Sequence, residues 1–372
     1  MRPETAEDWF ALVEEGDICQ VMCHLEAFAG TCDSSGETAL MHAVRNDNIP
    51  LVRLLREFEA GHHNNAGHTA LIIAIMLDRV EAFDALASVE GDIPSEDGVY
   101  PRLLAASQIN NRALESIIHY TEPKKTTDKG RSALMICSRV GNLEGVALLT
   151  EEDNLVSNMG CTALMYAAYY GRPEMVPLLI SEKRKVARDG MTALMIAVRK
   201  RHLDVACQLL DEACMTTHQR NFSALMLAAE RGNVAAVKLL GKQEGGIQSR
   251  DGLTALMLGA QKGSLEVVQL LSESEQRKQT NIGLTALMIA ASLGYIDIIQ
   301  YLLPLEGTMQ DKKGRTALMH AAYRGQAAAC KVLLALEGAK KDLEGRTATV
   351  YASVRGHTEI VTLLSKAEEK EG

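Results

Sequence analysis

The stretch Asp311–Lys341, DKKGRTALMHAAYRGQAAACKVLLALEGAKK, decides the fold. Its Thr-Ala-Leu core, or a close variant, recurs along the chain with starts 30 or 31 residues apart, except for one gap of 63 residues. That gap equals two periods, and a degraded copy stands within it at Tyr100. The copies begin at Thr38, Thr69, Ser132, Thr162, Thr192, Ser223, Thr254, Thr285, Thr316 and, more weakly, Thr347. A fixed period in this range predicts a solenoid of stacked repeats.

One copy predicts a turn followed by two helices. The turn is residues 311–314, where the glycine supplies a positive φ. Thr316 stands where a hydroxyl can cap the first helix, and Gly325 stands where a glycine ends it. Apolar residues recur at helical spacing in both helices. They are Ala317, Leu318, Ala321 and Ala322 in the first helix, and Cys330, Leu333 and Leu334 in the second.

This unit resembles the ankyrin repeat, whose pattern is a β-turn, two helices and the motif T-P-L-H-x-A. Ala163 shows the replacement of the motif's Pro by Ala, and Met319 shows the replacement of its His by Met. The period is about 31 residues, whereas the ankyrin period is 33. The T-A-L-M variant also resembles the large stand-alone ankyrin families of diplomonad protists, some of which carry a kinase-like domain. The present chain contains no kinase motif.

The resemblance implies an all-α fold with short β-turn or hairpin fingers, arranged as a curved ankyrin-repeat solenoid. We expect an N-terminal capping helix pair over residues 1–30, with helices at 5–14 and 18–28 anchored by Trp9, Phe10 and Val13. About eleven repeats of about 31 residues then fill residues 31–366. Residues 367–372 form a polar tail.

Two places depart from the pattern. The third repeat, residues 95–126, has Tyr100-Pro101-Arg102 in place of Thr-Ala-Leu and turns between its helices at Ile109-Asn110-Asn111, where we expect an asparagine to take the left-handed conformation. This repeat is either a drifted copy that still stacks or a point where the array bends. Pro177 lies in the second helix of its repeat and should kink or distort that helix.

Composition limits the function and the location. The net charge of −9 and the pI near 5.7 argue against nucleic-acid binding. Eight scattered cysteines without a C-x-x-C pair suit a reducing compartment, so we expect a cytoplasmic protein, with attachment to the cytoskeleton through a partner left open. We find no apolar leader near the N-terminus and no run of about 18 apolar residues, so neither a signal peptide nor a membrane span is expected.

We expect no metal or other cofactor. Methionine recurs once per repeat, and a stacked core column explains it better than a metal-binding ladder. Cys19 and Cys23 are four residues apart, but no matching His or Cys pair follows, so two ordinary helix residues are favoured over zinc ligands. The methionines are Met41, Met135, Met165, Met195, Met226, Met257, Met288 and Met319.

The resemblance places partners on the concave face and at the turn tips. The seventh and eighth residues after each Thr lie just before the turn between the helices. Eight of these 22 residues are basic and one, Glu230, is acidic, although the whole chain has 48 acidic and 39 basic residues. The basic ones are Arg45, Arg139, Arg199, Lys200, Arg231, Lys262, Arg324 and Arg355. The pattern predicts a basic stripe, and an ordinary solvated face is the alternative.

A second pattern lies directly after the turn glycine, a position that is usually exposed in ankyrin repeats. Five successive repeats place an apolar residue there: Cys161, Met191, Phe222, Leu253 and Leu284. These residues form either an exposed binding ridge or a packing contact between fingers. Together the patterns predict a docking site for an acidic peptide or protein surface with apolar anchors. Its candidate residues are Tyr169, Tyr170, Met191, Arg199, Lys200, Phe222, Arg231, Leu253, Lys262, Leu284, Arg315, Tyr323 and Arg324.

Catalysis is not expected. The chain has no Gly-rich phosphate loop, no H-E-x-x-H and no G-x-S-x-G. We expect a monomeric, non-enzymatic protein-interaction scaffold or adaptor. The alternative is a regulatory or inhibitory ankyrin subunit that acts in trans on an enzyme such as a protein kinase.

Overall fold

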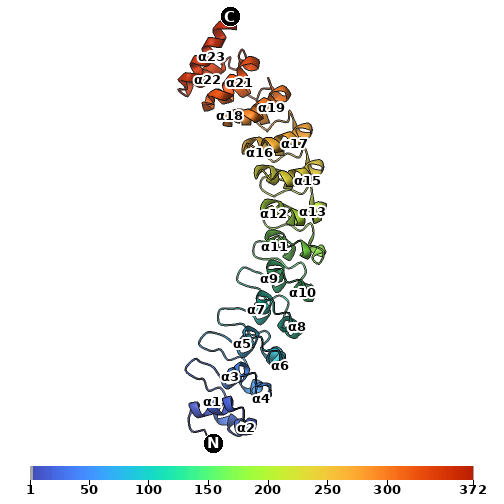
Figure 1. Cartoon of the computed structure of the whole chain (residues 1–372), viewed down its shortest axis with the longest axis vertical. Helices are drawn as coiled ribbons and strands as arrows, with labels where there is room; N and C mark the ends of the chain where they lie inside the picture. Colours follow the sequence, from blue (N-terminus) through green and yellow to red (C-terminus); the bar gives the residue numbers. More distant parts are fainter. Residues whose placement is uncertain (1–2, 372) are drawn as a thin grey trace. The chain divides into compact units, whose positions relative to one another are not determined.

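The computed structural model describes residues 3–371, with side chains as far as residue 367, so most of the predicted polar tail lies outside the described side chains. The chain forms two compact units, Met1–Lys185 and Val186–Gly372. Each unit is a stack of helix pairs in which the first, inner helices contact one another and the second, outer helices do the same (Figure 1). The all-helical repeat fold is therefore confirmed.

The first unit begins with the predicted capping pair, α1 and α2. Its elements are α1 Ala6–Glu15, α2 Ile18–Phe28, α3 Ala39–Arg45, α4 Ile49–Glu59, α5 Ala70–Met76, α6 Val80–Glu90, α7 Pro101–Gln108, α8 Asn111–Ile117, α9 Ala133–Val140, α10 Leu143–Leu148, η1 Thr150–Glu152, α11 Ala163–Tyr170, η2 Pro173–Met175 and η3 Ile180–Glu182. Trp9, Phe10 and Val13 are buried, as expected for the anchors of a cap.

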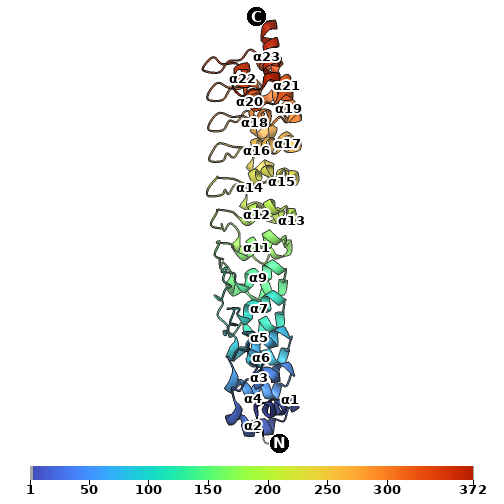
Figure 2. The same ribbon diagram turned by 90° about the vertical axis from the view of Figure 1, so that its left-hand side faces the viewer.

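The second unit repeats the same pair with little variation. Its elements are α12 Ala193–Lys200, α13 Leu203–Gln208, η4 Leu210–Glu212, α14 Ala224–Glu230, α15 Val234–Glu244, α16 Ala255–Lys262, α17 Leu265–Glu275, α18 Ala286–Leu293, α19 Ile296–Glu306, α20 Ala317–Arg324, α21 Ala327–Glu337, α22 Ala348–Val354 and α23 Thr358–Glu371. Figure 2 shows its fingers as a row of loops on one side, each leading into an inner helix.

The Thr-Ala-Leu-Met segment forms the buried face of each inner helix. All eight predicted methionines are buried, as are Ala317, Leu318, Ala321 and Ala322, which confirms the core column. Burying a leucine or methionine side chain is worth about 1.5–3 kcal/mol. The core is thus a set of thin layers that recur with the sequence period.

The expected hydroxyl cap is present in most repeats but absent at Thr316. The side chains of Thr69, Ser132 and Thr254 accept from the backbone N–H three residues on, whereas Thr316 makes no side-chain cap bond. The start of α20 is held by Glu337, whose Oε2 accepts from the N–H of Leu318 at 2.7 Å, as an equivalent carboxylate does in the repeats that also have the hydroxyl cap. The prediction of a hydroxyl cap at Thr316 was therefore wrong.

This carboxylate belongs to a series that we call the bridging glutamates. They are Glu59, Glu90, Glu152, Glu182, Glu212, Glu244, Glu275, Glu306 and Glu337, and all are buried. In each, Oε2 accepts from the N–H of the Thr-Ala-Leu leucine of its own repeat at 2.6–2.8 Å. Each carboxylate therefore caps an inner helix from the end of the following outer helix.

The second oxygen of most bridging glutamates reaches the preceding repeat. In seven of them Oε1 accepts a backbone N–H at 2.8–3.2 Å from the loop that follows the previous outer helix. The donors are Gly30, Gly61, Asn154, Cys214, Gly246, Arg277 and Thr308, and all have positive φ, which aims the N–H at the next repeat. Burial raises the pKa of Glu90, Glu182, Glu275, Glu306 and Glu337, and these hydrogen bonds offset part of that shift.

Replacing Glu275 by glutamine should destabilise the protein by about 1–3 kcal/mol. The amide keeps one acceptor, but it turns an NH₂ donor toward one of the two backbone N–H groups that now bond to Glu275. Denaturant unfolding at neutral pH measures the effect. Glu273→Gln, an exposed change on the same helix, is the matched control and should be neutral within about 0.5 kcal/mol. Equal stability of the two variants would contradict the bridging role.

In three repeats the chain between the Thr-Ala-Leu leucine and its bridging glutamate is one residue shorter. The glutamate lies 18 residues after its leucine for Glu152, Glu182 and Glu212, and 19 residues after it at Glu275. Each of these three glutamates is the last residue of a 3₁₀ turn, η1, η3 or η4. A 3₁₀ turn rises about 2.0 Å per residue against 1.5 Å for an α-helix, so fewer residues cover the same distance. Pro177 falls between η2 and η3, where the outer α-helix is lost altogether, so the predicted distortion is confirmed and is larger than a kink.

The degenerate third repeat still stacks, because α7 contacts α5 and α9 and α8 contacts α6 and α10. It lacks a bridging glutamate, and Thr121 stands at that position. Pro123, which has no N–H, stands where the next bridging glutamate, Glu152, would find its donor. Arg102 compensates for both changes. Its buried guanidinium donates to the Thr121 carbonyl at 3.2 Å and forms an ion pair with Glu152 at 2.8 Å.

Replacing Arg102 by leucine alone should destabilise the protein by about 3–5 kcal/mol, because it leaves the Glu152 carboxylate buried without its cation. The combined variant Arg102→Leu, Thr121→Glu, Pro123→Gly rebuilds the arrangement of the other repeats and should recover most of that loss. Denaturant unfolding of both variants is the measurement. A single variant as stable as the original protein would refute the compensation.

Candidate protein-binding surfaces

The fingers are tight turns, and in residues 3–371 they form no strand beyond one isolated bridge between Cys32 and Thr38. In the second unit successive fingers are joined by backbone hydrogen bonds, such as the Lys312 N–H to the Ile282 carbonyl at 3.2 Å and the Leu343 N–H to the Lys313 carbonyl at 3.1 Å. The fingers of the unit therefore form one connected surface.

Three glutamines reinforce this finger surface. The Nε2 of Gln248 donates to the carbonyl of Gly252 in its own finger and to that of Gln279 in the next. Gln279 and Gln310 repeat the same pair of bonds one and two repeats further on. These glutamines are not among the residues predicted from the sequence, although their spacing of 31 residues matches the repeat.

The predicted apolar ridge is not an exposed surface. Met191 and Phe222 are each only 5% exposed, and Cys161, Leu253 and Leu284 are half-buried. The reason is local: the carbonyl of each of these residues closes its own finger, as in the Ala187 N–H to Met191 bond at 2.9 Å, and so the side chain sits at the finger root. Arg220 also covers the Phe222 ring, with its guanidinium carbon 5.6 Å from the ring centre. Packing at the fingers, the alternative interpretation, accounts for these residues.

The basic residues of the second unit do lie along one edge. Arg199 and Lys200 end α12, Arg231 follows α14, Lys262 ends α16 and Arg324 ends α20. These helices and α18 form an unbroken series of neighbours in which each contacts the next, so their C-terminal ends line up. We call these five residues the basic edge.

Three charges of the basic edge are available to a partner. Arg231, Lys262 and Arg324 are exposed, and within the described residues their side chains form no ion pair. Exposed apolar side chains lie between them: Leu293 ends α18, and Tyr323 on α20 lies under Arg355, whose guanidinium carbon is 4.8 Å from the ring centre. The edge thus combines free positive charge with apolar contacts.

Arg315 differs from the other predicted basic residues because its charge is already paired. Its Nε lies 2.7 Å from Oδ2 of Asp311, and His320 Nε2 lies 3.1 Å from the same oxygen. Burial opposes ionisation of Asp311, but hydrogen bonds from the backbone N–H groups of Arg315 and Lys313 and from the Arg315 side chain lower its pKa overall. Arg315 therefore supports its finger, and its charge is not free.

Replacing Asp311 by asparagine should destabilise the protein at pH 7. The folded pKa of Asp311 lies below the unfolded value, so its contribution is complete above about pH 4 and is lost as the pH falls through the folded pKa. The difference from the original protein should therefore narrow in acid. Denaturant unfolding across that pH range measures it, with the exposed Asp297→Asn as control. A difference that stays constant from pH 7 into acid would show that the carboxylate charge is irrelevant.

Tyr169 and Tyr170 belong to the first unit, at the end of α11. Both side chains are exposed, and their rings are 4.9 Å apart in a tilted arrangement. They form a small aromatic patch of the kind that is frequent in protein interfaces.

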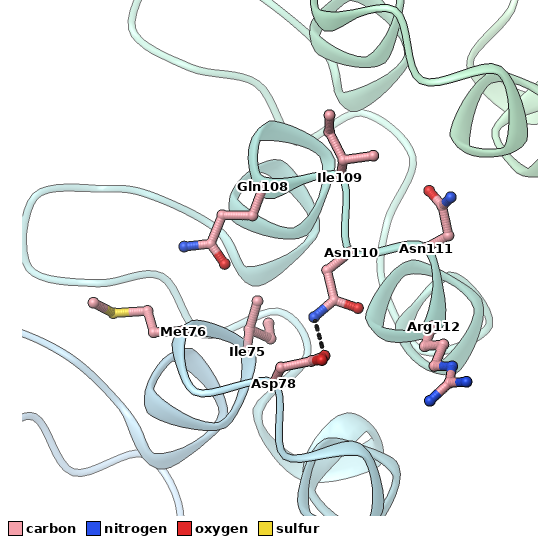
Figure 3. Close-up of a pocket in the computed structure, with 8 residues that line it drawn as sticks. All are labelled: Ile75, Met76, Asp78, Gln108, Ile109, Asn110, Asn111 and Arg112. Atoms are coloured by element: carbon pink, nitrogen blue, oxygen red, sulfur yellow. Dashed lines mark hydrogen bonds between the residues drawn. The ribbon is translucent and has the colours of Figure 1, made fainter.

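A pocket of about 470 Å³ also lies in the first unit, between the turns that end α5 and α7 (Figure 3). We call it the turn pocket. Ile75, Met76 and Ile109 provide its apolar atoms, Asp78 and Arg112 its charges, and the side chains of residues 108, 110 and 111 its amides. Asn110 donates to Asp78 at 3.0 Å, as the dashed line in Figure 3 shows.

The backbone at this pocket corrects one sequence prediction. Ile109, and not an asparagine, adopts the left-handed conformation, with φ 60° and ψ 32°. In the neighbouring repeats the residue at this position after the inner helix is also left-handed. These residues are Asp47, Asp78 and Gly141. The position is set by the length of α7, whatever residue occupies it. A left-handed L-residue costs roughly 1–2 kcal/mol, and a β-branched one is a clear outlier.

Two further findings concern other classes of protein. In the part of the chain that the structure describes, no three His, Cys, Asp or Glu side chains gather as metal ligands do. None of the described helices is both long and apolar enough to cross a membrane. None of the eight cysteines, all of which lie in the described residues, forms a disulfide, and Cys19 and Cys23 are exposed.

The stacked helix pairs with projecting fingers define a helical-repeat protein. A family model described as ankyrin repeats (3 copies) matches residues 9–97, 103–189, 155–223, 181–250, 225–310 and 287–371. The chain belongs to the ankyrin-repeat family, whose repeats are generally protein–protein interaction modules. No match was found among curated proteins.

Proposed function

We propose that this chain is a non-enzymatic scaffold or adaptor that holds an acidic protein segment along the basic edge and the neighbouring fingers of the second unit. One observation carries the proposal. A chain with a net charge of −9 gathers exposed arginines and lysines at the ends of adjacent inner helices, and the side chains of Arg231, Lys262 and Arg324 form no ion pair among the described residues.

Charge and shape both favour a polypeptide partner. Complementary charge speeds the encounter with an acidic partner and sets its register more than it adds affinity. Leu293 and Tyr323 supply the apolar contacts that hold a partner once it is bound. The connected fingers offer a preformed surface, so little ordering accompanies binding.

We further propose a monomeric protein in the cytoplasm, with contact to the cytoskeleton through a partner as an open alternative. Eight scattered cysteines, none of them in a disulfide among the described residues, support a reducing compartment.

The triple variant Arg231→Glu, Lys262→Glu, Arg324→Glu should lose partner capture by at least about tenfold, which corresponds to 1.4 kcal/mol. The matched control is Lys242→Glu, Lys331→Glu, Lys366→Glu, which makes the same charge change at exposed positions on outer helices. Affinity capture with mass spectrometry, at low and moderate salt, is the measurement. Equal capture by the two triple variants would rule out the basic edge.

The same experiment separates the two functional classes. Recovery of structural or cytoskeletal proteins favours a scaffold. Recovery of one enzyme in equal amount, such as a protein kinase, favours the regulatory or inhibitory subunit.

A further inference from the structure

We propose that the turn pocket of the first unit is a second docking site, which takes one apolar side chain of a protein partner with a carboxylate beside it. The proposal goes beyond the basic edge, because it concerns the other unit and different residues. Three observations support it: the conformation of Ile109, the exposure of the apolar wall of the pocket and the unpaired charge of Arg112.

The pocket lies at a repeat position where two other repeats of the first unit hold an arginine. In the first unit Arg79 reaches back to the Arg45 carbonyl at 3.1 Å, and Arg172 reaches back to the Val140 carbonyl at 3.2 Å. The residue at this position in the third repeat is Asn110, which reaches only the side chain of Asp78. The pocket lies beside Asn110, between the turns that end α5 and α7.

Ile109 is unfavourable for the fold on two grounds. Its backbone is left-handed, where glycine or aspartate stands in the neighbouring repeats. Its side chain is 52% exposed, so burial does not compensate for the backbone strain. Strained residues cluster at ligand-binding sites. Ile109 is one of the residues that line the pocket, and Figure 3 shows it in the turn that follows α7.

The pocket is apolar on one side and has the size for a side chain. Met76 is 49% exposed, and Ile75 lies buried behind it. A dry apolar cavity of about 150 Å³ can hold benzene, so the volume of about 470 Å³ accepts a leucine or phenylalanine side chain together with part of its backbone.

The charges of the pocket favour a carboxylate as the neighbouring group. Asp78 already accepts from Asn110. Arg112 is exposed, and none of the described residues forms a hydrogen bond or an ion pair with its guanidinium. The fitting occupant is thus a protein segment in which an apolar residue lies next to an aspartate or glutamate.

The decisive variant is Ile109→Gly. A glycine accepts the left-handed conformation without strain, so the midpoint of thermal unfolding should be no lower than that of the original protein. Removing the pocket wall should nevertheless weaken binding by about tenfold or more. Loss of binding without loss of stability cannot be ascribed to misfolding.

The probe is a random peptide library displayed on phage and selected against the full chain, followed by titration of the selected peptides as synthetic molecules. The proposal expects enrichment of apolar–acidic pairs, weaker binding by Ile109→Gly and by Arg112→Gln, and unchanged binding by two controls. The controls are Leu143→Ala, an exposed apolar residue on α10, and Arg139→Gln, a basic residue on α9.

Several results would overturn the proposal. One is enrichment of peptides without an apolar–acidic pair, and another is binding that neither pocket variant weakens. A third is self-association of the original chain that Ile109→Gly abolishes, since a second copy would then fill the pocket. Because the basic-edge triple variant leaves this pocket intact, failure of one proposal is distinguishable from failure of the other.

Discussion

The bridging glutamate is the interaction on which the stack depends. One buried carboxylate joins three pieces of chain: the end of its own outer helix, the start of its own inner helix and the loop that leaves the preceding repeat. An unsatisfied backbone N–H in such a place is costly, so the distances between these three pieces are held within narrow limits. The constraint explains the 3₁₀ turns where the chain is one residue shorter, and it explains why the donor loop residue has positive φ even when it is Asn154, Arg277 or Thr308.

Much of this fold was predictable because apolar residues at helical spacing recur ten times with the same period. The helices, the methionine column and the capping pair follow from that pattern. The bridging glutamates recur with the same period, at Glu275, Glu306 and Glu337 for example, and yet were missed. A glutamate is usually exposed unless it is paired, and nothing in its own residue type shows that two backbone N–H groups will meet it. Its periodicity was the signal that could have identified it.

The surfaces were predictable only where helix geometry alone decides exposure. The basic edge lies at helix ends, so Arg231, Lys262 and Arg324 are exposed as expected. The residues after the finger glycine depend instead on how the finger closes, and closure turned Met191 and Phe222 inward. Arg315 shares this dependence, since its ion pair with Asp311 forms only when the finger folds. Sequence position therefore located the charges, while tertiary contacts determined which of them remain free.

The third repeat shows that a repeat can still stack when its residue types change, provided that other polar side chains replace the lost contacts. Arg102, Thr121 and Pro123 each break the pattern, and Arg102 compensates by bonding to Thr121 and pairing its charge with Glu152, while α7 keeps its place in the stack. Ile109 lies in the same repeat and has no such compensation: it is strained, exposed and outside the network of the bridging glutamates. Departures that compensate one another are explained by folding. The strain at Ile109 and the open pocket have no such explanation, and this contrast within one repeat supports our proposal that the turn pocket binds a partner.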